Sequence, residues 1–237
     1  MEGERVMGVR ARRAFRDRPA EAHPQPDLNP YVRLHREYAE IVPGDQAPSY
    51  RGRWSEVFGR DAPLHLEIGT GNGSFFAAMA GKLPDCNFVG VEIRFKRVVQ
   101  GAKRIRAADL TNARMVRYDA FFLADLFEPA SLAAIYLNHP DPWPKGKHEK
   151  NRLISKAFLS WAAGALVPGA ALRLKTDAPH NIERLEESIV GLPFRVLGKC
   201  ADVRRDGAPW SDDIVTGYQA MFDRAGTPVH AMWIERL

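Results

Sequence analysis

A glycine-rich turn at residues 66–74 carries the side chains and backbone best suited to binding a ligand. Its glycines are Gly69, Gly71 and Gly73, in the sequence Leu-Glu-Ile-Gly-Thr-Gly-Asn-Gly-Ser. Glycines after a strand let the backbone bend sharply and approach a ligand closely, with the N-terminus of a helix behind it. A dinucleotide fingerprint needs Gly-x-Gly-x-x-Gly, and Ser74 stands where its third glycine belongs. The carboxylate of Glu67 would repel a pyrophosphate but attract a cationic amino acid, so the turn favours S-adenosylmethionine.

Two further acidic residues follow the next two predicted strands. Glu92 ends the second strand, where a carboxylate can accept hydrogen bonds from both ribose hydroxyls of an adenosine. The same geometry serves NAD, so Glu92 alone does not distinguish the two ligands. Asp119 ends the third strand and could accept from the adenine amino group, or it could cap the N-terminus of a helix. Taken with the glycine turn, these acids predict a methyltransferase.

Three prolines surround an acidic and an aromatic residue after the fourth predicted strand. Prolines stiffen the backbone here and restrict the positions of Asp141 and Trp143. Asp141 could hold the Watson–Crick edge of guanine, while Trp143 supplies a stacking surface. The basic residues that follow would meet phosphates at the rim of the pocket: Lys145, Lys147, His148, Lys150 and Arg152. The alternative is a proline-rich turn that leads into a basic, solvated helix.

The elements that must position these residues begin at Pro63, where short apolar runs alternate with longer helical patterns. The predicted strands are Leu64–Ile68, Phe88–Ile93, Met115–Tyr118, Ala133–Leu137, Ala171–Lys175, Phe194–Leu197 and Val229–Ile234. Repeated strand–helix alternation predicts a doubly wound α/β fold: a mostly parallel, seven-stranded sheet with helices on both faces and a late antiparallel pair. Ligands of such sheets bind beyond the carboxyl ends of the strands, which is where the acidic residues lie.

Composition restricts the partners of the chain. Its 237 residues carry a formal charge of 34 − 29 = +5, with a pI near 9.3, which weakly favours an anionic partner such as nucleic acid. Two cysteines exclude a disulfide scaffold and a cysteine-built metal site, and no metal is expected. The longest uncharged run, Ala157–Leu172, is too short to span a bilayer, and no apolar segment follows Met1. We therefore expect a cytoplasmic protein that does not contact membranes.

Residues 1–30 differ in composition from the rest. They carry six arginines and four prolines with little apolar periodicity, so they bury too little surface to offset the cost of ordering. We expect a flexible basic tail that is either solvated or ordered by RNA. Residues 31–60 hold scattered aromatic residues among mixed charges, which predicts a helix and a loop packed on the main body. Residues 31–237 are therefore expected to form one domain.

Three segments together resemble the tRNA (guanine-N7)-methyltransferases, a family of class I S-adenosylmethionine-dependent enzymes. They are Leu66–Gly73, Asp141–Lys145 with His148, and Thr176-Asp177 after the fifth strand. The resemblance implies a Rossmann-like fold. It also implies methylation of a variable-loop guanine in tRNA at ring nitrogen seven, with S-adenosylmethionine as the methyl donor. The sequence leaves open whether the protein is a monomer or a homodimer.

The resemblance, carried over by position, implies roles for individual residues. Asp141 would be the catalytic residue and would also contact the cofactor. The other cofactor-binding residues would be Glu67, Gly69, Gly71, Gly73, Glu92 and Asp119. The substrate-binding residues would be Lys145, Asp177, Thr216 and Gln219.

Four positions depart from the pattern of the family. Gln219 stands where a glutamate is usual, Asn151 where a second arginine is common, His139 where an aromatic is usual, and Asn181 near an expected tyrosine. These departures leave open a diverged paralogue that acts on another RNA or base, such as an exocyclic amino methyltransferase. They also leave open a catalytically weak protein that binds the cofactor and RNA. A small-molecule methyltransferase is a further alternative, which the basic rim disfavours.

Overall fold

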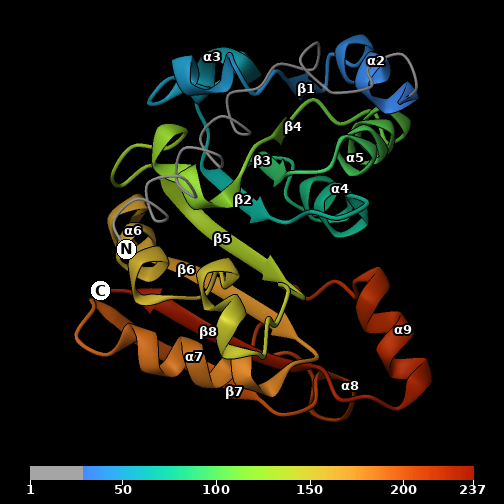
Figure 1. Cartoon of the computed structure of the whole chain (residues 1–237). Coiled ribbons are helices and arrows are strands. Elements are labelled where there is room, and N and C mark those ends of the chain that lie inside the picture. The colour runs from blue at the N-terminus through green and yellow to red at the C-terminus, as the bar shows by residue number, and fades with distance from the viewer. Residues whose placement is uncertain (1–28) are drawn as a thin grey trace. The chain divides into compact units, whose positions relative to one another are not determined.

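The structure, a computed structural model, describes residues 29–237 of the chain (Figure 1). The predicted basic tail therefore lies outside the described residues, apart from Asn29 and Pro30, which begin the first described helix. The described chain separates into two compact units. Unit 1 comprises residues 29–62 and 70–126, and unit 2 comprises residues 63–69 and 127–237. Each unit is described by itself.

Unit 1 contains a parallel sheet of three strands. Strand β4 (Ala113–Arg117) lies between β1 (Ile41–Val42) and β3 (Asn87–Glu92), and it is parallel to both. The sequence predicts β3 and β4, with ends that differ by one or two residues. It does not predict β1, because two residues are too few to show an alternation of apolar and polar side chains. The predicted number of seven strands is therefore one too low, because it omits β1.

Helices of unit 1 form where apolar residues recur at helical spacing. Its helical elements are α2 (Pro30–Glu37), η2 (Ala47–Tyr50), α3 (Trp54–Phe58), α4 (Ser74–Lys82), α5 (Phe95–Ala107) and η3 (Ala120–Asp125). In α5 the buried side chains of Val98, Ala102 and Ile105 lie on one face, at three- and four-residue intervals. The basic residues of α5 lie mostly on the opposite, solvated face.

Unit 2 contains five strands in the order β2-β5-β6-β8-β7 (Figure 1). They are β2 (Leu64–Ile68), β5 (Leu132–Asn138), β6 (Leu166–Thr176), β7 (Phe194–Cys200) and β8 (His230–Arg236). The first three are parallel, and β8 runs antiparallel to both of its neighbours, which confirms the predicted late antiparallel pair. Strand β6 starts earlier than predicted because Leu166 pairs with Leu132 ahead of a bulge.

The two faces of this five-stranded sheet differ in polarity, because successive side chains of a strand point to opposite faces. One face is apolar and fully buried, with Leu66, Ile135, Leu137, Leu172 and Leu174. Helices α6 (Lys156–Ala165) and α7 (Pro179–Ile189) pack against β6. The other face carries the charged side chains of Arg173 and Lys175 on β6.

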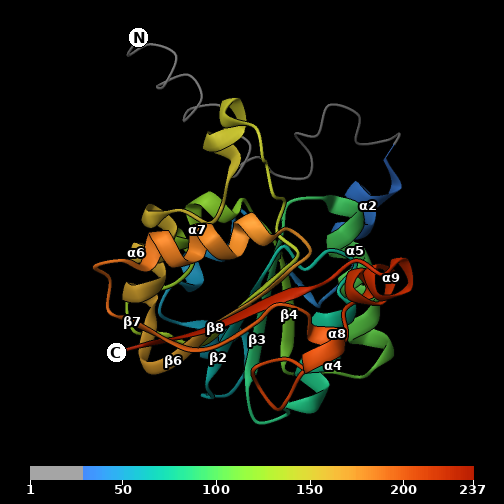
Figure 2. The same ribbon diagram turned by 90° about the horizontal axis from the view of Figure 1, so that it is seen from below.

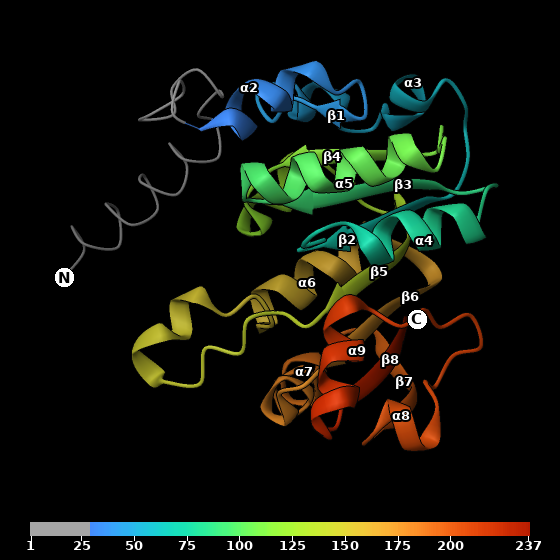
Figure 3. The ribbon, with the colours of Figure 1, turned by 90° about the vertical axis from the view of Figure 1, so that its right-hand side faces the viewer.

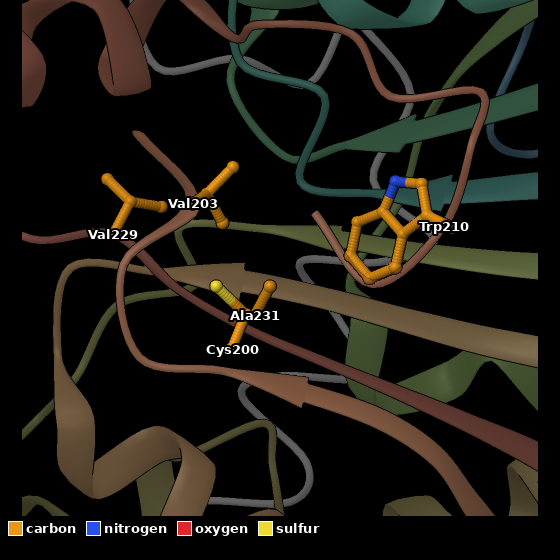
Figure 4. Packing of buried hydrophobic residues seen from close by; sticks show 5 residues of the cluster. All are labelled: Cys200, Val203, Trp210, Val229 and Ala231. Atoms are coloured by element: carbon orange, nitrogen blue, oxygen red, sulfur yellow. The ribbon is translucent and has the colours of Figure 1, made fainter. Parts of the chain in front are cut away.

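The charged face is covered by the chain between β7 and β8. This segment contains α8 (Val203–Asp206) and α9 (Gly217–Ala225). A small apolar cluster anchors it, formed by the buried side chains of Cys200, Val203, Trp210, Val229 and Ala231 (Figure 4). The covering segment therefore has its own core, which fixes the loop that approaches Lys175.

Candidate active site

In unit 1, Glu92 is held by backbone amides at the end of β3. Its Oε2 accepts a hydrogen bond from the N–H of Gly71 at 3.1 Å, and its Oε1 accepts from Ile93 at 2.8 Å and Arg94 at 3.0 Å. The carboxylate therefore fastens the glycine turn to the end of the strand. These hydrogen bonds also orient the carboxylate of Glu92, which the sequence predicts to accept from the ribose hydroxyls of an adenosine.

The three glycines of the turn have different structural roles. All have positive φ angles, of 74° at Gly69, 54° at Gly71 and 76° at Gly73. A Cβ added at Gly69 or Gly71 would meet no atom within 4 Å, so the backbone is open to a ligand there. A Cβ added at Gly73 would lie 2.5 Å from the Cα of Gly101. Gly73 is thus required for the packing of α4 against α5, a structural need that the sequence does not reveal.

Replacing Gly73 with alanine is expected to lower the free energy of unfolding by about 3 kcal/mol, because the new Cβ clashes with backbone and the residue has positive φ. Gly81 in the same helix is the matched control. Its added Cβ would lie 3.7 Å from Leu110, an ordinary contact, so Gly81→Ala should stabilise by about 0.5–1 kcal/mol. Urea unfolding of both variants tests this. Equal stabilities for the two would contradict the packing role.

Asp119 caps a helix, which is the alternative that its sequence position allowed. It is buried, and its Oδ1 accepts from the backbone N–H of Phe121 at 3.0 Å, at the start of η3. A cap uses one of the lone pairs of the carboxylate. Contact between Asp119 and an adenine amino group stays a prediction.

In unit 2, Glu67 is almost fully buried at the end of β2, with 2% of its surface exposed. Its Oε1 accepts from the side-chain amide of Asn138 on β5 at 3.0 Å. Burial lowers the pKa of Lys175 on β6, and the negative charges of Asp213 and Glu67 oppose this shift. The ends of β2, β5 and β6 thus bring together one acid, one amide and one ammonium.

The loop that carries Asp141 is fixed through its carbonyl groups. Prolines lack an N–H, so carbonyls are their only backbone hydrogen-bonding groups. Asn181 of α7 donates to the carbonyl of Pro140 at 3.1 Å, and Arg184 of α7 donates to that of Pro142 at 2.7 Å. The carbonyl groups of the prolines on both sides of Asp141 are therefore held by one helix, while the side chain of Asp141 is exposed to solvent.

Strained backbone accompanies this loop. His139 and Trp143 have φ angles of 50° and 40°, which residues other than glycine seldom adopt. The carbonyl of Trp143 accepts from Arg152 at 3.0 Å, which helps to hold the turn in place. Non-glycine residues in such conformations cluster at functional sites. The strain supports the prediction that this loop carries chemistry.

A basic arm follows the loop. It contains η4 (Gly146–Asn151) and projects away from the sheet of unit 2 (Figures 2 and 3, yellow). Lys145, Lys147 and Lys150 are exposed on it. Arg152 follows η4, and its side chain donates to the carbonyl of Lys145 at 3.4 Å. The arm thus presents cations next to Asp141, as a phosphate-binding rim requires.

His139 joins two of the predicted substrate-binding residues. Its Nδ1 lies 3.2 Å from Oδ1 of Asp177, and its Nε2 lies 3.1 Å from Oγ1 of Thr216. Thr216 in turn caps α9 by accepting from the backbone N–H of Gln219 at 2.9 Å. The ends of β5 and β6 and the start of α9 are therefore linked through one imidazole.

Gln219 is buried and bonded to Lys175, which is also buried. The Nζ of Lys175 donates to Oε1 of Gln219 at 2.9 Å, to Oδ1 of Asp213 at 2.9 Å and to the carbonyl of Ile214 at 2.6 Å. These three acceptors match the three donors of an ammonium. The side-chain carbonyl of Gln219 thus points into the protein, so its predicted contact with substrate stays a prediction.

Sequence reasoning missed several residues of this site. It noted His139 only as a departure from a family pattern, and it assigned no role to Arg173 or Lys175. Asn181, also noted as a departure, anchors the Asp141 loop. No sequence feature indicated a role for Arg184, because a single arginine on an amphipathic helix is an ordinary surface residue.

Acid is expected to destabilise the fold through buried histidines. Burial lowers the pKa of His35 to about 4 and that of His65 to about 4, and it lowers the pKa of His139 as well. Since the unfolded chain binds these protons near pH 6.5, stability is present above that pH and is lost as the pH falls towards 4. Each of His35 and His65 should account for about 2 kcal/mol of loss between pH 7 and 5.

Urea unfolding at several pH values measures this loss. His65→Gln should show a shallower dependence than the wild type, since it removes one of the groups that titrate. A stability that stays flat from pH 7 to 5 would contradict the assignment.

No group of three or more His, Cys, Asp or Glu side chains within residues 29–237 could hold a metal ion. Every helix in the same part of the chain is too short or too polar to cross a membrane.

Comparisons with known proteins agree with one another. Residues 61–232 match the family model Methyltransf_4, described as "Putative methyltransferase". The tRNA (guanine-N(7)-)-methyltransferase of Bacillus subtilis (strain 168) is 32% identical over 199 residues, which cover 84% of this chain and 92% of the relative. The protein of the same name from Brevibacillus brevis is 34% identical over 195 residues, covering 82% of this chain and 90% of the relative.

Among solved structures, the 16S rRNA methyltransferase KamB is similar, with a TM-score of 0.57 and 14% identity, over 78% of this chain and 93% of KamB. At this identity the similarity concerns the fold alone. It confirms the predicted α/β, Rossmann-like fold class.

Proposed function

Because the chain belongs to the Methyltransf_4 family of methyltransferases, we propose that it methylates ring nitrogen seven of a guanine in the variable loop of tRNA, using S-adenosylmethionine. The observation that carries the proposal is the similarity to a tRNA (guanine-N(7)-)-methyltransferase over 84% of the chain. The basic arm beside Asp141 supports an RNA substrate. We also propose that the protein acts on tRNA in the cytoplasm, as the sequence predicts.

The residues present suit S-adenosylmethionine. The open backbone at Gly69 and Gly71 leaves room for close approach of a ligand. Glu92 would accept from the ribose hydroxyls and Asp119 from the adenine amino group, as the sequence predicts. Glu67 would attract the positive charge of the amino-acid portion, and Asp141 would contact the cofactor from the proline-rich loop. When bound, S-adenosylmethionine supplies an electrophilic methyl group.

The chemistry needs no general base from the chain. Ring nitrogen seven of guanine carries a lone pair in the plane of the ring, so no proton has to leave before it attacks the methyl carbon. The task of the protein is to align nitrogen, carbon and sulfur, and orientation of this kind supplies several kcal/mol. The fixed backbone on both sides of Asp141 suits that task, because it limits the positions that the carboxylate can take.

Two carboxylates would act on the transition state. Positive charge develops on the purine as the methyl group arrives, and the carboxylates of Asp141 and Asp177 would stabilise it while they hold the base. Lys145 would contact a phosphate or the base at the rim, and Thr216 and Gln219 would line the substrate side. The exposed position of Asp141 is consistent with direct contact to a substrate.

The test is identification of the product. The purified protein is incubated with methyl-labelled S-adenosylmethionine and a tRNA transcript, and the digested RNA is analysed by mass spectrometry. We expect 7-methylguanosine, and its loss from a transcript in which the variable-loop guanine is replaced by adenine. Methylated adenine or cytosine would indicate an exocyclic amino methyltransferase instead. Binding of both ligands without methyl incorporation would leave only a binding protein.

A further inference from the structure

His139 occupies a constrained place at the end of β5. Its side chain is 4% exposed, and its backbone has a φ angle of 50°. The backbone N–H of His139 donates to the carbonyl of Lys175 at 2.7 Å. Two aromatic rings of α9 pack against the imidazole, with centroid distances of 5.8 Å to Tyr218 and 5.5 Å to Phe222. The imidazole therefore has little freedom to rotate.

The hydrogen bonds of His139 determine where its proton lies. The carboxylate of Asp177 can only accept, so Nδ1 of His139 carries the proton and donates to Oδ1. In the neutral ring Nε2 then accepts, and the hydroxyl of Thr216 is its donor. The oxygen of that hydroxyl accepts in turn from the backbone N–H of Gln219. Each of these three hydrogen bonds therefore has one donor and one acceptor.

The surroundings keep the ring neutral. Burial lowers the pKa of His139, and Lys175 acts in the same direction, while Asp177 opposes them. Lys175 lies on β6, and Asp177 follows the end of that strand. At α9 the ring meets the N-cap residue Thr216 and the aromatic rings of Tyr218 and Phe222. A neutral imidazole is what the donor and acceptor pattern requires.

We propose that His139 is a positioning residue for Asp177: its Nδ1–H holds Oδ1 of the carboxylate, so that Oδ2 is aimed at an N–H of the guanine to be methylated. This role rests on the proposed function. It assigns a purpose to a residue that departs from the usual aromatic of the family. The aromatic packing is retained, and two hydrogen bonds are added to it.

Kinetics of matched variants test the proposal. His139→Phe keeps the ring packing but loses both hydrogen bonds, so kcat should fall about 10- to 100-fold while KM for S-adenosylmethionine changes less than twofold. His139→Asn, whose amide lies near the place of Nδ1, should recover part of that loss. In an Asp177→Asn background, His139→Phe should have no further effect. His230→Phe, a half-buried histidine outside the network, is the control and should keep wild-type kcat.

The tautomer of His139 gives an independent readout. Nitrogen NMR of the wild type should show the Nδ1–H tautomer at neutral pH. An Nε2–H tautomer, an unchanged kcat in His139→Phe, or an effect that persists undiminished in the Asp177→Asn background would overturn the role of His139 alone. Failure of the wild type to methylate guanine would overturn the proposed function, and the positioning role with it.

Discussion

Replacing Asp141 with alanine is expected to abolish methyl transfer, with kcat lowered at least about 1,000-fold, while S-adenosylmethionine still binds. The carboxylate holds the guanine and stabilises the charge that develops on it, and nothing else on the proline-rich loop can replace an anion. The loop itself should keep its shape. Its flanking carbonyls are bonded to Asn181 and Arg184, and neither bond involves the side chain of Asp141.

Product formation and calorimetric titration with the cofactor measure the two effects separately. Asp85 is a matched control, because it is also exposed and follows a proline whose carbonyl accepts from a side chain, Arg60 for Pro84 and Asn181 for Pro140. Asp85→Ala should keep full activity. The free energy of unfolding of Asp141→Ala should also lie within about 0.5 kcal/mol of the wild-type value, as is usual when an exposed side chain is replaced. Retained turnover in Asp141→Ala would remove this residue from the mechanism.

Replacing Lys175 with methionine is expected to lower the free energy of unfolding by about 3–5 kcal/mol, since it breaks a buried ion pair by removing one partner. Lys175 is 1% exposed and donates to Asp213, Ile214 and Gln219. Without its ammonium, all three acceptors lose this hydrogen bond, and Asp213 still accepts from Nε1 of Trp210 at 3.1 Å. The loop that leads to Thr216 would lose its attachment to β6, so activity should fall as well.

Urea unfolding checks the size of this loss. Lys103→Met on the solvated face of α5 is the control, and it should change stability by no more than about 0.5 kcal/mol. A second substitution, Asp213→Leu in the Lys175→Met protein, should restore part of the stability, because it removes the charge that was left alone. A loss below about 1 kcal/mol in Lys175→Met would show that the ammonium is not essential to the fold.

The strands could be predicted from the sequence because each is a short apolar run bounded by turns, and periodicity is a local signal. Strand β1 could not be predicted, because its two residues form a strand only through pairing with β4. The acids at the strand ends could also be predicted, since each of them lies at or near the end of such an apolar run.

The supporting hydrogen bonds could not be predicted in the same way. Lys175 and Gln219 are 44 positions apart, and nothing in either local sequence indicates that one bonds to the other. The role of His139 depends on a left-handed backbone conformation that favours glycine and that a histidine seldom adopts. Gly73 could be recognised as part of a ligand-binding turn, but its contact with Gly101 exists only after two helices pack. Such features arise from tertiary structure.

The position of β8 between β6 and β7 affects the order in which unit 2 can assemble on the ribosome. Strand β7 is synthesised before β8, yet its strand partner is β8. Until residues 230–236 leave the exit tunnel, the nascent chain holds β7 without a partner and β6 with one open edge. Unpaired edges of this kind invite association with other chains. Synthesis of β8 therefore gives β6 and β7 their shared partner at the same time.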